Sequence, residues 1–288
     1  GLFSIFFSLF VQQLFYTKRI YMYKLFAIDI DDTLLAKDLT ISRVNQKAIQ
    51  KARKAGVKIV ICSGRATSSL WPYIQELDLV QPKEYTISYN GAMIVENSNQ
   101  RKCFYRGISQ TYTQHLLDVA NQWGIDVQLY IEDDLVVDRI TDRIHQYVVM
   151  SGMNVVEVGN LNTYIKGETI KVLFNGNHEV LKKAVVELEP WIQGKLHMFF
   201  SKPEYLEFVN IEANKGLAVL HLAKELGIER ENIMTIGDSF NDLYMIEAAG
   251  MGIAVANAHP DIKKLADYVT KKTHEEDAVA EAIGKFLL

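Results

Sequence analysis

Three carboxylates lie within four residues of one another near the start of the chain: Asp29, Asp31 and Asp32. Acidic groups this close repel, and each raises the pKa of its neighbours. A chain that concentrates them at one point needs a cation there, or needs one of the acids to stay protonated. An acidic, solvated turn is the plainer interpretation, and it would be preferred if the cluster stood alone.

Three further loops carry polar groups that could bind a phosphate. Ser63 and Gly64 offer a hydroxyl and a backbone amide at a helix start, a combination that holds phosphate oxygens. Lys215 falls in the first turn of a predicted helix, where the helix dipole disfavours a cation. The segment Gly237 to Asp242 adds two carboxylates, an amide and a hydroxyl. Each loop alone is explained as an ordinary turn or helix cap, but the four together are poorly explained that way.

The elements that precede these loops alternate in the manner of a parallel sheet. The first predicted helix begins after the N-cap Ser42 and ends at Gly56. The resulting β-α-β-α-β order requires parallel strands, whose carboxyl ends bind ligands in open sheets. If strand geometry continues through Asp31, its carboxylate and that of Asp29 point the same way. The predicted strands are Lys24 to Asp29, Lys58 to Cys62 and Tyr85 to Tyr89, with a second helix from about Thr67 to Leu77 and a turn at Asn90-Gly91.

The middle of the chain, from about Gly107 to Lys202, follows a different rhythm of helices and shorter strands. We interpret it as an α+β module inserted into the parallel-sheet domain. The segment Tyr205 to Asn210, a helix from Lys215 to Leu226 and a strand from Ile233 to Ile236 are expected to resume the parallel sheet. Within the module the predicted helices are 113–123, 141–150 and 178–191, and the predicted strands are 126–131, 135–137, 169–174 and 196–200.

The composition is that of an ordinary soluble protein. The chain has 288 residues with a formal net charge of -4, enough for one large domain or two modest ones. A mildly acidic balance without a basic stripe argues against nucleic-acid binding. Cys62 and Cys103 show neither a disulfide framework nor metal-ligand spacing, which favours a reducing, cytoplasmic location. Nothing in the sequence indicates the oligomeric state.

The first 21 residues are interpreted separately because they are rich in Phe and Leu. A secretory signal would carry its positive charge before the apolar run, whereas Lys18 and Arg19 follow it. The run is also shorter than a membrane span. An amphipathic anchor is one interpretation. We favour another, in which the folded protein begins at Met22, residues 1–21 are an extension, and no membrane association is expected.

The four loops, in this order, resemble the motifs of the haloacid-dehalogenase-like (HAD) hydrolase superfamily. The motifs are D-x-D-x-T at Asp29 to Thr33, a serine at Ser63, a lysine at Lys215, and G-D-x-x-N-D at Gly237 to Asp242. The resemblance extends from Met22 to the C-terminus. The long insertion resembles the large α/β cap of the Cof-type sugar-phosphate phosphatases, and Asn90-Gly91-Ala92 and Asn214-Lys215-Gly216 look like that branch. Many relatives carry Gly where Asp32 stands.

This resemblance implies an α/β fold, with a Rossmann-like parallel-sheet core and an inserted α+β (C2-type) cap domain. The core would comprise residues 22–105 and 203–288, and the cap residues 106–202. The activity implied is Mg²⁺-dependent hydrolysis of small phosphate monoesters, with sugar phosphates as the favoured class, through an aspartyl-phosphate intermediate.

The resemblance also implies a role for each motif residue. Asp29 would be the nucleophile, and Asp31 the acid and then the base. Mg²⁺, which prefers oxygen ligands, would be bound by Asp29, the Asp31 backbone carbonyl and Asp238, with Ser239 or Asp242 close by. The groups expected to hold the phosphate oxygens are Ser63, the Gly64 and Ile30 amides, Lys215 and Asn241.

Two other functions stay open at this point. A phosphomutase or phosphotransferase of the same superfamily would use the same residues but pass the phosphoryl group to a sugar. A non-catalytic protein that binds phosphorylated metabolites is the second alternative, although every motif position is present. The sequence does not name the substrate. Cap residues should set specificity, and Glu132 and Asp133 are weak candidates.

Overall fold

Eight strands form the larger of two sheets and carry the loops described above. The computed structural model describes residues 22–288, so the predicted extension, residues 1–21, lies outside the described residues. In spatial order the strands are β14 (Tyr268–Val269), β13 (Met251–Ala254), β12 (Ile233–Gly237), β1 (Leu25–Ile28), β2 (Lys58–Cys62), β3 (Tyr85–Ser88), β4 (Met93–Glu96) and β5 (Arg101–Tyr105). The strands from β14 to β3 run parallel. The strands β4 and β5 add an antiparallel edge.

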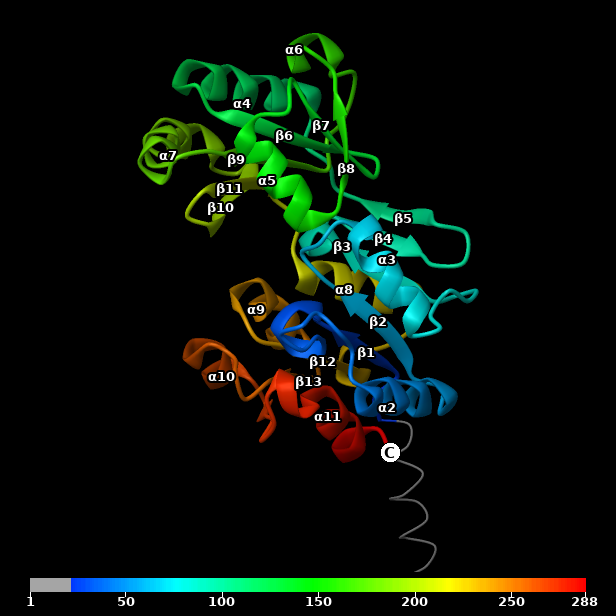
Figure 1. Ribbon diagram of the computed structural model, residues 1–288. Coiled ribbons are helices and arrows are strands. Elements are labelled where there is room, and N and C mark those ends of the chain that lie inside the picture. Colours follow the sequence, from blue (N-terminus) through cyan, green and yellow to red (C-terminus); the bar gives the residue numbers. More distant parts are fainter. Residues whose placement is uncertain (1–21) are drawn as a thin grey trace, which may run out of the picture.

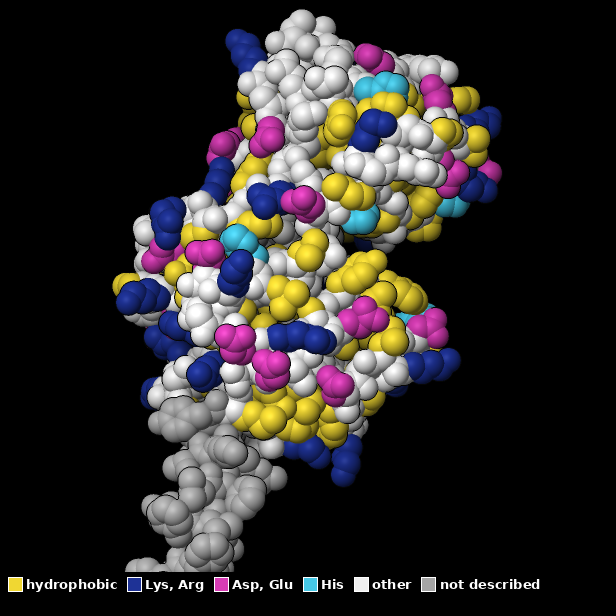
Figure 2. All heavy atoms as spheres, turned by 180° about the vertical axis from the view of Figure 1, so that it is seen from behind, with side chains coloured by type: hydrophobic (Ala, Val, Ile, Leu, Met, Phe, Trp, Pro, Cys, Tyr) yellow, Lys and Arg dark blue, Asp and Glu magenta, His cyan; other side chains and the backbone are white. Residues whose placement is uncertain are grey.

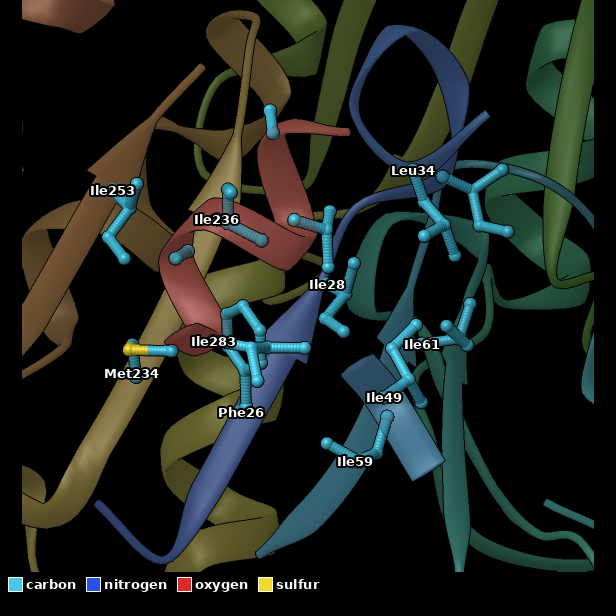
Figure 3. Packing of buried hydrophobic residues seen from close by; sticks show 14 of the residues in the cluster. Phe26, Ile28, Leu34, Ile49, Ile59, Ile61, Met234, Ile236, Ile253 and Ile283 are labelled. Carbon is cyan, nitrogen blue, oxygen red and sulfur yellow. The ribbon is translucent and has the colours of Figure 1, made fainter. Parts of the chain in front are cut away.

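Helices cover both faces of this sheet, which explains the unbroken apolar runs of its central strands. Phe26 and Ile28 of β1 pack under one group of helices, on the same face of the sheet as Ile236 of β12 and Ile253 of β13 (Figure 3). Leu25 and Ala27 face the other group. The first group contains α2 (Arg43–Lys54), α3 (Thr67–Glu76), α10 (Pro260–Leu265) and α11 (Ala278–Phe286), and α8 (Lys215–Glu225) covers the opposite face, while α9 (Leu243–Ala248) contributes to both.

The predicted start and end of the first helix are confirmed. The Ser42 hydroxyl caps α2 by accepting a hydrogen bond from the Asn45 amide at 3.0 Å. The chain leaves the helix through Gly56, whose φ of +94° is a conformation that glycine adopts without a steric cost. These local signals place β2 immediately after the helix, and β2 in turn positions Ser63.

The smaller sheet has six strands and forms the upper lobe in Figure 1. Its spatial order is β10 (Leu196–Lys202), β11 (Tyr205–Asn210), β9 (Lys171–Asn175), β6 (Asp126–Ile131), β7 (Asp134–Val137) and β8 (Asn154–Glu157). All pairs are antiparallel except β7 with β8. One face packs against α4 (Gln110–Trp123), α6 (Leu161–Tyr164) and α7 (His178–Ile192), and the other against α5 (Asp142–Ser151).

The predicted fold class is confirmed, because a parallel α/β core carries an inserted α+β cap. One strand was assigned to the wrong sheet. The expectation that Tyr205 to Asn210 resumes the parallel sheet is wrong, since β11 pairs with β10 and β9 in the smaller sheet. The turn around Pro203 makes a hairpin, and Leu206 and Phe208 complete the apolar face of the cap. We therefore propose that the cap extends to Asn210 rather than to residue 202.

Two adjacent linkers join the lobes. Arg106 Nε lies 2.7 Å from Glu212 Oε2, and the Asn210 side-chain amide donates to the Gly107 carbonyl at 2.8 Å. Seen from behind, the lobes are separated on one side by a notch, with hydrophobic side chains along its lower edge (Figure 2). In the part of the chain from residue 22 onward, no helix has the length and apolar character needed to cross a membrane.

Candidate active site

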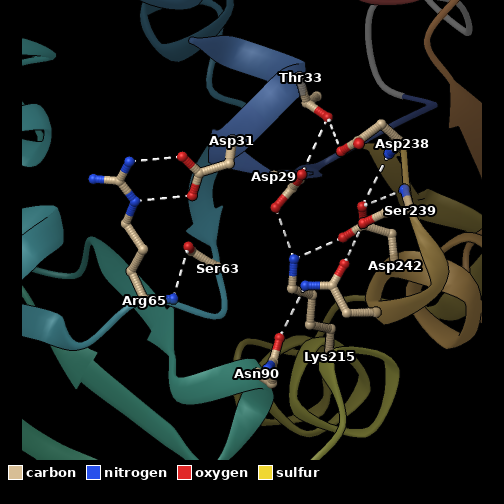
Figure 4. Close-up of polar contacts among 11 residues, drawn as sticks. Asp29, Asp31, Thr33, Ser63, Arg65, Asn90, Lys215, Asp238, Ser239 and Asp242 are labelled. Atoms are coloured by element: carbon tan, nitrogen blue, oxygen red, sulfur yellow. Dashed lines mark hydrogen bonds and ion pairs between the residues drawn. The ribbon is translucent and has the colours of Figure 1, made fainter. Parts of the chain in front are cut away.

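The first strand ends immediately before Asp29. A tight irregular turn follows, in which Asp32 has a left-handed φ of 57°. Strand geometry therefore does not continue through Asp31, and the condition for the two carboxylates to share a direction is not met. Figure 4 shows Asp29 pointing toward Lys215 and Asp31 pointing toward Arg65. The two acids thus have separate partners.

Lys215 is the cation around which the buried acids are arranged. Its Nζ lies 2.7 Å from Asp29 Oδ1 and 2.6 Å from Asp242 Oδ1. The lysine side chain is wholly buried in the first turn of α8, where Asn214 caps the helix by accepting from the Leu217 amide. Burial by itself would lower the pKa of Lys215, but the two carboxylates outweigh it and the pKa is raised. The lysine therefore carries a positive charge, and these two acids offset its unfavourable position in the helix dipole.

Three acids lie together beside this lysine, which contacts two of them, Asp29 and Asp242. Burial is the main reason that the pKa of Asp29 rises to about 7. Burial likewise raises the pKa of Asp238 to about 6 and that of Asp242 to about 6. With all three ionised, three negative charges and one positive charge leave the cluster at a net charge of -2. Such a cluster is stabilised either by protons or by a divalent cation.

The same three acids have the geometry of a cation site. One carboxylate oxygen from each of Asp29, Asp238 and Asp242 lies within 4.8 Å of the others. Thr33 bridges two of them, with its Oγ1 at 3.1 Å from Asp29 Oδ2 and 2.9 Å from Asp238 Oδ1. The carboxylate atoms that could bind a cation here are all oxygens, the ligand type that Mg²⁺ prefers. The residues present therefore fit a magnesium ion.

The loop after β12 is shaped by Asp242. Its Oδ2 accepts hydrogen bonds from the backbone amides of Asp238 and Ser239, at 2.9 and 3.2 Å. A Cβ at Gly237 would lie 2.5 Å from this carboxylate, so only glycine fits there. The Ser239 hydroxyl donates to Asn241 Oδ1 at 2.7 Å. Asp242 thus anchors the loop and contacts Lys215 with its other oxygen.

A second group of residues lies on the other side of Lys215. The buried Ser63 at the end of β2 accepts a hydrogen bond from the Arg65 amide at 3.0 Å. The side-chain amide of Asn241 donates to Asn90 Oδ1 at 3.0 Å. Gly64 passes so close to Asn90 that a Cβ there would lie 2.9 Å from the same oxygen. The hydroxyl, the glycine amide and the asparagine amide are thereby placed next to the acid cluster.

The structure brings most of the motif residues to one edge of the large sheet. Asp29, Lys215, Asp238 and Asp242 form the buried cluster. Ser63, Gly64, Ser239 and Asn241 surround it, while the side chain of Ile30 is buried in the core beneath. Asp31 lies apart from the three clustered acids and contacts Arg65.

Three residues at this edge were given no role from the sequence: Thr33, Arg65 and Asn90. Thr33 was recognised only as the last position of its motif. Arg65 directly follows Ser63-Gly64, and its adjacency was the available signal. Asn90 was interpreted only as a turn residue, although it follows the third parallel strand and therefore lies at the same edge.

Comparison with known proteins identifies the family. A family model described as haloacid dehalogenase-like hydrolase matches residues 26–283. A Bacillus subtilis (strain 168) protein named "Putative phosphatase YxeH" is 32% identical over 269 residues, covering 93% of this chain and 99% of that protein. The 5-amino-6-(5-phospho-D-ribitylamino)uracil phosphatase YcsE of the same organism is 30% identical over 270 residues, covering 92% of this chain and 96% of that protein.

The fold comparison agrees with this result. The crystal structure of a haloacid dehalogenase-like hydrolase from Bacteroides thetaiotaomicron superimposes with a TM-score of 0.85 at 31% identity, covering 91% of this chain and 99% of that one. Sequence, fold and site therefore agree, and the chain belongs to the haloacid dehalogenase-like hydrolases, as a phosphoric monoester hydrolase of that family.

Proposed function

We propose that this protein is a Mg²⁺-dependent phosphatase that hydrolyses small phosphate monoesters, sugar phosphates among them, through an aspartyl-phosphate. The observation that carries the proposal is the buried arrangement of Asp29, Lys215 and Asp242, with Asp238 within reach of the same point. A charge-compensated carboxylate at the end of the central strand is a suitable nucleophile for phosphorus, provided that the negative charge of the phosphate is also compensated.

In the first step an oxygen of Asp29 forms a bond to phosphorus while the bond from phosphorus to the leaving oxygen breaks. Asp31 gives its proton to that leaving oxygen, and the alcohol departs. In the second step water attacks the phosphorus of the aspartyl-phosphate and Asp31 takes a proton from it. Inorganic phosphate leaves, and the carboxylate of Asp29 is restored.

The positive groups of the site supply the charge compensation. The residues that would hold Mg²⁺ are Asp29 and Asp238, with the Asp31 carbonyl, Ser239 and Asp242 as further oxygen donors. When bound, the ion reduces the repulsion between the anionic nucleophile and the anionic phosphate. The phosphate oxygens would be held by Lys215, the Ser63 hydroxyl, the Asn241 amide and the backbone amides of Gly64 and Ile30.

The names of relatives support a substrate class rather than one compound. Relatives at 26–30% identity are named as phosphatases of 5-amino-6-(5-phospho-D-ribitylamino)uracil, of HMP-PP and of phosphoglycolate. These names point to small phosphorylated compounds, and the core groups described above would contact only the phosphate end of such a compound. A cytoplasmic location, predicted from Cys62 and Cys103, stays a prediction. The two thiols are free, as that prediction expects.

A panel of phosphate esters with Mg²⁺ tests the proposal. We expect release of inorganic phosphate from several sugar phosphates and from p-nitrophenyl phosphate, loss of this activity with a chelator, and recovery when Mg²⁺ is added back. Transfer of the phosphate to a second sugar instead of water would identify a phosphotransferase. Binding without any turnover would contradict the proposal.

A further inference from the structure

Arg65 binds the carboxylate of Asp31 through two parallel hydrogen bonds. Its Nε donates to Oδ2 at 2.8 Å and its Nη2 donates to Oδ1 at 2.6 Å. A guanidinium that binds both oxygens of a carboxylate fixes the plane of that carboxylate as well as its distance. Figure 4 shows this pair on the side of Asp31 away from Asp29 and Lys215.

The position of Arg65 is fixed by two backbone hydrogen bonds and one contact with an aromatic ring. Its amide donates to the Ser63 hydroxyl at 3.0 Å, and its carbonyl accepts from the Tyr89 amide at 2.9 Å. Its guanidinium carbon lies 5.6 Å from the ring centre of Tyr73 on α3. The ends of β2 and β3 and one helix therefore determine where the guanidinium sits.

Asp31, in contrast, has little else to orient it. Its side chain is 47% exposed and stands on the irregular turn after β1. Across residues 22–288, Arg65 provides all the hydrogen bonds that this carboxylate accepts. Asp29 differs, because both Lys215 and Thr33 fix it. The direction of the Asp31 carboxyl group thus depends on Arg65.

We propose that Arg65 is a positioning residue, which orients Asp31 for proton transfer to the leaving oxygen. This inference rests on the proposed function. When Asp31 gives up its proton as the bond from phosphorus to the leaving oxygen breaks, it becomes the carboxylate that Arg65 binds. In the second step that carboxylate takes a proton from the attacking water. Misplacing a reacting group by about 1 Å costs on the order of 10²-fold in rate, so loss of this orientation slows proton transfer strongly.

A direct contact between Arg65 and the substrate phosphate is the competing role, since a guanidinium also suits phosphate. The two roles differ in what they do to the leaving group. p-Nitrophenolate is a stable anion that departs without a proton, whereas phenolate from phenyl phosphate gains much more from one. The two esters have nearly the same shape, so their ratio isolates the proton transfer.

The experiment measures kcat/KM for phenyl phosphate and p-nitrophenyl phosphate in the wild type, Arg65→Gln and Arg65→Lys. We expect Arg65→Gln to lower kcat/KM for phenyl phosphate by about 10- to 100-fold, and that for p-nitrophenyl phosphate far less. Lysine keeps the charge without the planar fork, so Arg65→Lys should give the same selective loss to a smaller degree. Arg101→Gln, which breaks an exposed pair with Glu96, is the matched control and should leave both values unchanged.

A double-mutant cycle completes the test. If Arg65 acts through Asp31, adding Arg65→Gln to Asp31→Ala should cause no further loss on phenyl phosphate. The inference would be overturned if Arg65→Gln lowered kcat/KM equally for both esters, or if it still lowered kcat/KM in the Asp31→Ala background. Either result would mean that Arg65 contacts the substrate phosphate directly. A wild type that hydrolyses neither ester would instead refute the proposed function. Since the pair is partly exposed, both Arg65 variants should keep the thermal stability of the wild type.

Discussion

At the scale of single residues, the acid cluster holds more negative charge than its lysine neutralises. Burial, together with this uncompensated charge, raises the pKa values of Asp29, Asp238 and Asp242 to about 6 to 7 in the metal-free protein. The Nζ of Lys215 binds Asp29 and Asp242 at once, and these are the two buried acids of the cluster. The third acid, Asp238, is less buried and lies toward solvent, where an ion could enter.

The first residue-scale prediction concerns Asp29 as nucleophile. Asp29→Asn keeps the shape of the side chain and removes one of the buried negative charges. Turnover of p-nitrophenyl phosphate should fall by at least about 10³-fold, as for nucleophiles in other enzymes. Stability of the metal-free protein should be kept or should increase, because the cluster carries less charge. Near-normal turnover in the variant would refute the assignment.

The second residue-scale prediction concerns how pH and Mg²⁺ change the stability of the protein. The three acids have an ordinary pKa of 3.8 and folded-state values of about 6 to 7. Between these values the folded state binds more protons than the unfolded state, so the free energy of unfolding falls as pH rises from about 4 to 7. In the proposed site Mg²⁺ would bind the ionised acids, so it should cancel this loss. The rise in melting temperature caused by Mg²⁺ should therefore be larger at pH 8 than at pH 5.

Melting curves with Mg²⁺ and with a chelator, over the same pH series, check this prediction without any assay of activity. The variant Asp29→Asn provides the comparison, since it removes one ligand and one titrating group. A Mg²⁺ effect that does not change with pH would contradict the role of these acids as a metal site.

At the scale of elements, the turn between β3 and β4 packs directly on the start of α8. Gly91 has a φ of +94°, and a Cβ there would lie 2.2 Å from the backbone carbonyl oxygen of Asn214. That carbonyl belongs to the residue immediately before Lys215. The turn therefore sets how closely the lysine-bearing helix approaches the strand ends.

Gly91→Ala should consequently shift the first turn of α8 and pull Lys215 away from Asp29. We expect the free energy of unfolding to fall by about 1–3 kcal/mol from the clash, with a further loss from the positive φ. Activity should fall more than stability at a temperature where the variant is still folded. Gly284→Ala in α11 is the matched control, because a Cβ there meets nothing within 4 Å, and it should stabilise by about 0.5–1 kcal/mol. Denaturant unfolding measures both.

How far the elements could be predicted from the sequence depended on whether the signal was local. Ser42 and Gly56 delimit α2 through cap and turn chemistry, and the strand Lys58–Cys62 was predicted with its observed bounds. The edge strand Asn154–Glu157 and the single turn Leu161–Tyr164 were missed, because four residues carry too little periodicity. The partner strands of Tyr205–Asn210 could not be predicted from the sequence, because an apolar strand fits either sheet.

The same distinction applies to the site. Three of the motif loops follow strands of the large sheet and could be placed at one edge from strand order alone. The Lys215 loop follows β11 of the cap sheet, and the packing of α8 brings its lysine to the same edge. Contacts such as Arg65 with Asp31 or Asn90 with Asn241 lie outside this reasoning. They join residues 34 and 151 positions apart in the chain, and only the packed fold brings them within bonding distance.

At the scale of the whole molecule, two lobes with separate cores meet at the linkers and across one apolar cluster. That cluster contains Tyr89 from the turn after β3, Met93 of β4, and Tyr130 and Val209 from the cap. The sequence candidates Glu132 and Asp133 lie on the β6–β7 turn, where Glu132 pairs with Lys102 of β5 at 2.5 Å. Glu132 therefore helps to join the lobes, and the two residues stay candidates for specificity.

The strand β10 offers further candidates for specificity. Phe199 packs against the cluster that joins the lobes, and His197 pairs in register with Val209 of that cluster. Both side chains are half-buried. They lie on the face of the cap sheet opposite the one that α4 and α7 cover. We propose that this face closes over bound substrate, because two short linkers beside the site join the cap to the core.

His197→Ala and Phe199→Ala should therefore change the ratios of kcat/KM among sugar phosphates by about 10-fold or more. Both should leave kcat/KM for p-nitrophenyl phosphate within a few-fold of the wild type, because in the proposed mechanism the core groups contact only the phosphate and the leaving oxygen. Val186→Ala on α7 is the matched control: its side chain is 72% exposed on the far face of the cap, and its removal should change no ratio. The measurement is the panel of kcat/KM values for each variant. If His197→Ala and Phe199→Ala changed kcat/KM by the same factor for every substrate, the role of this cap face would be structural. Substrate choice would then have to come from the core loops.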